Sequence, residues 1–206
     1  MKMPIPERQK SRLSSGARQA DIIQIVLTLT AQQSPADITT MAIAKAIGLT
    51  QGAVFRHFPT KEAIWLSVLD WVRRSLLSRI EDAAQSVADP LAALRAAFAA
   101  HVQFIKDQPG VPRIIFHELQ QPGDSPLKQQ VREILRSHKK IVMTLLQTAQ
   151  QQGQIDTALQ LESASTLFLG AIQGLAMQAM AAGATADLQQ LSEGVLEVLL
   201  SGVERR

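Results

Sequence analysis

Apolar residues recur at intervals of three and four along almost the whole chain, and no stretch shows the sustained alternation that is typical of strands. Pro35, Gly48 and Pro59 interrupt this pattern in the first third and divide it into separate helices. The predicted helices cover about 15–31, 40–47, 50–57 and 60–80 in the first part, and about 90–106, 111–120, 125–152, 161–182 and 187–203 in the rest. The pattern therefore predicts an all-α protein.

Two of the predicted helices are unusually short, and the turn between them contains a glycine. Ile43 and Ile47 on the first can meet Val54 and Phe58 on the second, which predicts a small core between two helices that cross at an angle. Gly48 lies at the turn, where glycine adopts a positive φ at low cost. This arrangement is typical of a helix-turn-helix motif.

The outer face of the second short helix carries side chains suited to DNA. In the major groove Gln can pair with adenine and Arg with guanine, and the methyl group of Ala can lie on that of thymine. The candidate residues on this face are Gln51, Gly52, Ala53, Phe55, Arg56 and His57.

The segment 18–65 resembles the DNA-binding domain of the TetR family of repressors. The resemblance rests on T-T-x-x-I-A-x-x-x-G at Thr39–Gly48 and on G-x-x-F-x-H-F-x-x-K-E at Gly52–Glu62. It implies an all-α homodimer with an N-terminal three-helix helix-turn-helix DNA-binding domain and a larger C-terminal helical domain for ligand binding and dimerisation. We place the first domain at 15–62, after a basic flexible arm at 1–14, and the second at 63–206.

The resemblance also assigns roles to single residues. Thr40 and Lys61 are expected to contact phosphates, Gln51, Ala53 and Arg56 to face bases, and His57 to lie near the DNA backbone. Thr39 is a further DNA-binding candidate, and Thr39 and Thr40 are alternatively ordinary helix caps. The family usually has Tyr where this chain has Phe55, so we expect one phosphate contact fewer in each subunit.

Charge and composition narrow the classes of protein further. Residues 1–61 carry eight Lys and Arg against three Asp and Glu, although the net charge of the chain is only +3, which favours a polyanionic partner for the first part. The basic arm either reaches DNA or only increases solubility. Cysteine is absent, which excludes disulfides, thiolate zinc sites and thiol catalysis. The polar, basic N-terminus is unlike a secretory signal, so we expect a cytoplasmic protein.

The segment 163–186 holds no charged residue over 24 positions, and two interpretations of it are open. A membrane helix with a small-residue contact motif would look similar, which makes a membrane-associated interaction protein the alternative function. Its glutamines, Ser, Thr and frequent Ala favour a soluble helix buried in a dimer. The residues expected at that interface, on this helix and the next, are Gly170, Gly174, Leu191, Val195 and Val198.

A ligand pocket is expected among the helices from Ile64 to Met180, although apolar positions at helical spacing are more often simple core. The apolar candidates are Phe104, Ile115, Phe116, Leu119, Met143, Leu146, Phe168, Ile172 and Met177, and the polar candidates are His117, His138 and Gln173. This composition suits a small, apolar effector. We expect no catalytic residue, metal or cofactor, because the four histidines are scattered and no hydrolase, P-loop or metalloenzyme motif occurs. The expected function is that of a ligand-responsive regulator, a repressor, that binds a palindromic operator as a homodimer.

Overall fold

The computed structural model describes residues 14–182 and 188–203, and these residues fold into α-helices joined by short turns. A 3₁₀ turn at Pro35–Asp37 follows the first helix. The helices are α1 (Ser15–Gln32), α2 (Thr40–Ile47), α3 (Gln51–His57), α4 (Lys61–Gln85), α5 (Pro90–Asp107), α6 (Gly110–Gln120), α7 (Pro126–Gln151), α8 (Leu161–Ala182) and α9 (Leu188–Ser201). The all-α prediction is confirmed, and every predicted helix is present close to its predicted bounds.

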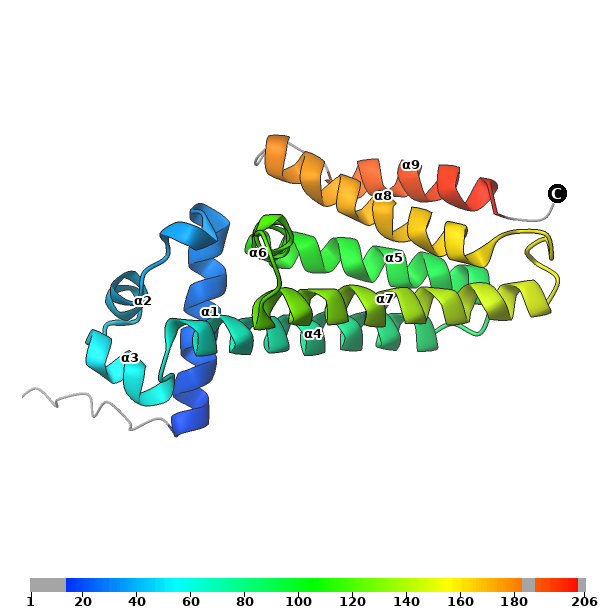
Figure 1. Cartoon of the computed structure of the whole chain (residues 1–206). Coiled ribbons are helices and arrows are strands. Elements are labelled where there is room, and N and C mark those ends of the chain that lie inside the picture. The colour runs from blue at the N-terminus through cyan, green and yellow to red at the C-terminus, as the bar shows by residue number, and fades with distance from the viewer. Residues whose placement is uncertain (1–13, 183–187, 204–206) are drawn as a thin grey trace, which may run out of the picture.

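The helices form two groups (Figure 1). α1, α2 and α3 gather at one end, whereas α4, α5, α7, α8 and α9 run alongside one another as an elongated bundle. α4 begins beside α1 and continues into the bundle without a break, through the predicted domain boundary at 62–63. The predicted arm at 1–14 falls outside the described residues except for Ser14, the N-cap of α1.

One apolar core connects the two groups. Ile22 and Val26 of α1 are fully buried in the same cluster as Ile43 of α2 and Val68 of α4, and this cluster extends to Ile134 of α7. A second cluster fills the space among α5, α7, α8 and α9. The N-terminal group and the bundle therefore share one packed interior.

α6 lies at the end of the bundle that faces α1 (Figure 1). Its first residue, Gly110, approaches α1 so closely that a Cβ there would stand 2.2 Å from the Thr30 hydroxyl and 2.7 Å from the carbonyl oxygen of Leu27. Real Cβ atoms are essentially never found at such distances. Glycine is therefore required for this contact between α6 and α1.

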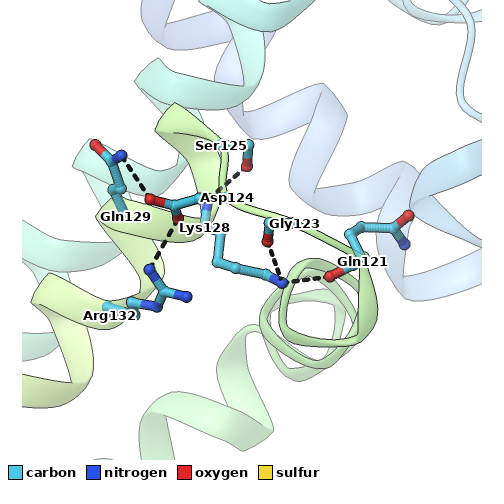
Figure 2. Close-up of polar contacts among 7 residues, drawn as sticks. All are labelled: Gln121, Gly123, Asp124, Ser125, Lys128, Gln129 and Arg132. Atoms are coloured by element: carbon cyan, nitrogen blue, oxygen red, sulfur yellow. Dashed lines mark hydrogen bonds and ion pairs between the residues drawn. The ribbon is translucent and has the colours of Figure 1, made fainter.

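The other end of α6 is held by a buried lysine (Figure 2). The Nζ of Lys128 donates to the carbonyl oxygens of Gln121 and Gly123, just beyond the last turn of α6. Only 7% of Lys128 is exposed. A cation at this position complements the negative end of the helix dipole and satisfies carbonyls that lack partners within the helix. α6 is thus fixed at both ends, by α1 and by α7.

Candidate DNA-binding surface and effector cavity

Side-chain caps define the helix-turn-helix. The hydroxyl of Thr39 accepts a hydrogen bond from the Ala42 amide at 3.1 Å, and that of Thr50 accepts from Ala53 at 3.2 Å. Between the two helices Gly48 has φ 71°, the left-handed conformation predicted for the turn. Thr39 is therefore the N-cap of α2, and Thr40 is its first residue.

The two short helices pack as the sequence predicted. Ile43 and Val54 are fully buried and Phe58 nearly so, which fixes the angle between α2 and α3. The end of α3 is also tied to α1, because the Gln19 side chain donates to the His57 carbonyl oxygen at 3.0 Å. The His57 ring lies 3.3 Å from the hydroxyl of Ser15 through its Nδ1. His57 therefore anchors the end of the candidate recognition helix to α1.

The remaining face of α3 is open. Gln51, Gly52 and Arg56 are exposed, Phe55 is 39% exposed, and Ala53 is half-buried. Gly52 has no neighbour within 4 Å of the position its Cβ would take, so the surface there is free to approach a duplex. The structure thus brings the candidate base-contacting side chains together on one surface.

Thr40 and Gln51 are linked across the motif. The Nε2 of Gln51 donates to the Thr40 hydroxyl at 2.6 Å, although the two were expected to bind different parts of DNA. A hydroxyl that accepts one hydrogen bond still has its own hydrogen to donate. Only 9% of Thr40 is exposed, and its hydroxyl retains a hydrogen to donate while it holds Gln51, whose amide oxygen remains available as an acceptor.

Lys61 and Met41 are accessible residues of the neighbouring helices α4 and α2. Lys61 is half-buried as the first residue of α4, and no ion pair to its side chain occurs among the residues that the structure describes. Met41 of α2 is 65% exposed and was not among the candidates predicted from the sequence. The sequence signal for the exposure of Met41 was its position outside the buried face of a short amphipathic helix.

A cavity opens within the bundle. The space that the centre of a water molecule can reach there is about 70 Å³, enough for several waters. α4, α5, α6, α7 and α8 all contribute to its wall. The lining residues are Val72, Leu76, His101, Phe104, Ile105, Val111, Pro112, Ile115, Phe116, Ile134, Leu135, His138, Leu169, Ile172, Gln173 and Ala176.

Two histidines and Gln173 provide the polar part of this wall. The ring centroids of His101 and His138 are 4.7 Å apart, and the Nδ1 of His101 and the Nε2 of His138 are buried with no hydrogen-bond partner. Burial lowers the pKa of His138 to about 4. Burial also lowers the pKa of His101 well below its ordinary value, and the neighbouring His138 lowers it further. Both imidazoles are therefore neutral at pH 7.

The candidate ligand residues separate into two sets. Phe104, Ile115, Phe116, His138, Ile172 and Gln173 line the cavity, with Gln173 exposed at its edge. The residues outside the lining are His117, Leu119, Met143, Leu146, Phe168 and Met177. Phe168 is buried against Phe98 and lies behind His138, while Met177 points outward and is 46% exposed. His101 was not selected from the sequence, because nothing in the pattern of α5 reveals which helix its histidine faces.

The candidate dimer residues lie on one side of the bundle, along α8 and α9 (Figure 1). Gly170 and Gly174 have open space where a Cβ would stand, and Leu191 and Val198 are 42% and 75% exposed. Val195 is half-buried between the two helices. Of the helices in the described residues, α8 alone is long and apolar enough to cross a membrane, and one such helix is weak evidence for a span.

The described residues contain no cluster of three or more metal-ligating side chains. Taken together, an open helix-turn-helix and a separate helical domain with an apolar cavity define a DNA-binding regulator with an effector domain. Two family models agree with this class. The model of bacterial regulatory proteins of the tetR family matches residues 25–68, and that of the YsiA-like protein C-terminal region matches residues 73–202. The chain therefore belongs to the tetR family of bacterial regulatory proteins.

The sequence identity between this chain and individual relatives is low. The chain is 26% identical over 164 residues to the fatty acid metabolism regulator protein of Bacillus subtilis, covering 80% of this chain and 84% of that protein. It is 25% identical over 131 residues to the nucleoid occlusion factor SlmA of Haemophilus ducreyi, covering 63% of this chain and 65% of SlmA. The chain thus spans slightly less than two thirds of SlmA.

A solved structure shares the fold. The crystal structure of the regulator FadR from Bacillus subtilis in complex with stearoyl-CoA has a TM-score of 0.79 and 24% identity, covering 89% of this chain and 98% of that one. The expected resemblance and fold class are confirmed by these matches, and the two Bacillus subtilis proteins are regulators by name.

Proposed function

We propose that this protein is a cytoplasmic repressor that binds a palindromic operator as a homodimer and responds to a small apolar effector. The observation that carries the proposal is the position of α6. Val111, Pro112, Ile115 and Phe116 of α6 form one wall of the cavity, and Gly110 of the same helix presses on α1. One short helix therefore joins the effector cavity to the helix on which the DNA-binding surface is built.

The DNA-binding step follows from the exposed face of α3. Gln51 and Arg56 read base edges, while Thr40 and Lys61 bind phosphates and set the register. Phe55 packs its ring on sugars or on a thymine methyl. One recognition helix of each subunit then enters the major groove of one half-site.

The dimer forms through the face of α8 and α9. Leu167, Leu191 and Val198 are large apolar side chains exposed on this face, and Gly170 and Gly174 allow close approach of a partner helix. A second copy of the chain covers these side chains when its α8 and α9 pack against α8 and α9 of the first copy, which makes a four-helix contact. A membrane is the alternative environment for this apolar face of α8 and α9. Recovery of the protein solely in the membrane fraction would favour a membrane over a second copy of the chain.

The switch is a change in the relative position of the two DNA-binding surfaces. An effector in the cavity displaces α6 through the residues of α6 that line it, and the contact at Gly110 transfers this displacement to α1. A complete switch changes the ratio of the two conformations from 1:99 to 99:1. It needs about 5.5 kcal/mol of difference in effector affinity between these conformations. An apolar effector is supported by the lining of the cavity, and the Bacillus subtilis relative is a regulator of fatty acid metabolism.

The decisive experiment is selection of bound duplexes from a random DNA pool by the purified protein at near-physiological salt. We expect enrichment of an inverted repeat with half-sites about one helical turn apart. Weak, salt-sensitive binding with no enriched sequence would contradict the proposal, because non-specific contacts alone produce that behaviour.

A further inference from the structure

The Nδ1 of His101 and the Nε2 of His138 are buried without hydrogen-bond partners, and both histidines line the cavity. Only 2% of His138 is exposed, and its ring lies between the His101 ring at 4.7 Å and the Phe168 ring at 6.3 Å. Leaving a buried polar atom without a hydrogen-bond partner is unfavourable. A ligand that supplies the missing partner recovers part of this cost, so the pair marks a point at which polar recognition is favourable.

The charge of the cavity limits what that ligand carries. No Lys, Arg, Asp or Glu is among the lining residues, and both imidazoles are uncharged at neutral pH because burial disfavours their protonated forms. A carboxylate placed here gains an opposite charge only if an imidazole takes up a proton, which burial disfavours, and an ammonium group gains none. The group that meets the histidines is therefore neutral.

Hydrogen-bonding capacity narrows the choice further. Each neutral imidazole has one N–H donor and one nitrogen acceptor. A hydroxyl group both donates and accepts, so it matches either nitrogen whichever tautomer is present. A carbonyl oxygen only accepts, and a hydrocarbon does neither. We propose that the pair formed by His101 and His138 recognises a hydroxyl group on an otherwise apolar effector.

The surroundings favour an alcohol with a compact apolar body. Phe104 and Phe116 line the cavity together with aliphatic side chains from five helices, and the space open to the centre of a water molecule is only about 70 Å³. This inference rests on the proposed function, since it specifies the effector of the proposed regulator. Its test measures ligand binding alone and uses no DNA.

The test compares four probes built on one ring: cyclohexanol, cyclohexanone, methylcyclohexane and cyclohexanecarboxylate. Each is titrated at pH 7 into the whole 206-residue chain, and the ring ¹⁵N signals of its four histidines are followed by NMR. We expect cyclohexanol to shift the signals of His101 and His138 and to bind about tenfold more tightly than methylcyclohexane, as one well-made buried hydrogen bond allows. Cyclohexanone should fall between them, and cyclohexanecarboxylate should bind most weakly.

Matched histidine variants test which residue produces the preference for the alcohol. His138→Phe keeps an aromatic ring but removes both nitrogens, so the preference for cyclohexanol over methylcyclohexane should fall to about twofold or less. His117→Phe makes the same change outside the cavity and should keep the preference. His101→Phe provides the same comparison if His138→Phe does not fold.

Two outcomes would overturn the inference: equal affinity for the alcohol and the hydrocarbon, or unchanged imidazole signals with every probe. A protein that gives either outcome but enriches an inverted repeat keeps its proposed function as a regulator. A protein that prefers the alcohol but enriches no DNA sequence keeps the hydroxyl site and loses that function.

Discussion

Gly110 and Thr30 are in direct contact across the boundary between the effector domain and the DNA-binding helices. A Cβ on Gly110 would stand 2.2 Å from the Thr30 hydroxyl and 2.8 Å from the backbone nitrogen of Ala31. Rotation of the hydroxyl cannot relieve the second contact, because that atom belongs to the backbone. The spacing between α6 and α1 is therefore set by the absence of a side chain at one position.

Gly110→Ala is expected to push α6 away from α1. Overpacking of this kind costs about 1–3 kcal/mol of unfolding free energy, and the displaced helix should weaken operator binding in the absence of effector. Urea unfolding and a DNA titration measure the two effects. Gly16→Ala is the control, because a Cβ at Gly16 meets nothing within 4 Å. Unchanged operator affinity in a destabilised Gly110→Ala protein would remove this contact from the switch.

Gln51→Ala should reduce operator affinity by about 1–3 kcal/mol for duplexes that carry the preferred base at one position, and much less for others. Lys61→Ala is the contrasting variant, because it removes a phosphate-binding side chain and should weaken binding to all DNA sequences alike. It should also lower the dependence of log affinity on log salt concentration by about one for each phosphate that is no longer neutralised. Affinities for a set of single-base operator variants at several salt concentrations separate the two. An unchanged base preference would mean that Gln51 serves only to hold Thr40.

Val198→Glu should dissociate the dimer while leaving the subunit folded, because 75% of Val198 is exposed in the single chain. Burial of an unpaired carboxylate in an apolar interface is unfavourable. Sedimentation equilibrium measures the mass, and operator affinity should fall with it because each subunit alone reads one half-site. Leu119→Glu, at an exposed apolar position of α6, is expected to stay dimeric. A dimeric Val198→Glu protein would place the interface elsewhere.

Lys128→Met should loosen the end of α6 and cost about 2 kcal/mol of unfolding free energy, since hydrogen bonds from a charged donor contribute about 1.5–3 kcal/mol. Chemical denaturation measures this loss. Arg132→Gln removes the exposed ion pair with Asp124, shown beside Lys128 in Figure 2, and should change stability by less than about 1 kcal/mol. Equal losses in the two variants would contradict the role of Lys128 as the anchor of α6.

The buried histidines should make the folded state sensitive to mild acid. The pKa of His138 is lowered from 6.5 to about 4 on folding, so the unfolded chain binds a proton in this range that the folded chain does not. Stability is therefore complete above about pH 6.5 and falls by about 3 kcal/mol as the pH approaches 4. Urea unfolding at a series of pH values should show a smaller decrease for His138→Phe. An identical decrease in that variant would assign the acid sensitivity to other groups.

The sequence by itself determined the helices and the DNA-binding motif, because these depend on local rules. Caps at Thr39 and Thr50 and the left-handed turn at Gly48 are decided within a few residues, and the face of α3 follows from its helical period. The boundary at 62–63 was harder to predict, since α4 runs through it without a break.

The tertiary structure decided the cavity, the contact at Gly110 and the bond between Thr40 and Gln51. His101 and His138 are 37 positions apart and meet only because α5 and α7 pack side by side, so no periodicity within either helix could pair them. Phe168 and Met177 lie on one apolar helix, yet one faces the core and the other solvent. Helical period tells which residues share a face, but only packing decides what that face meets.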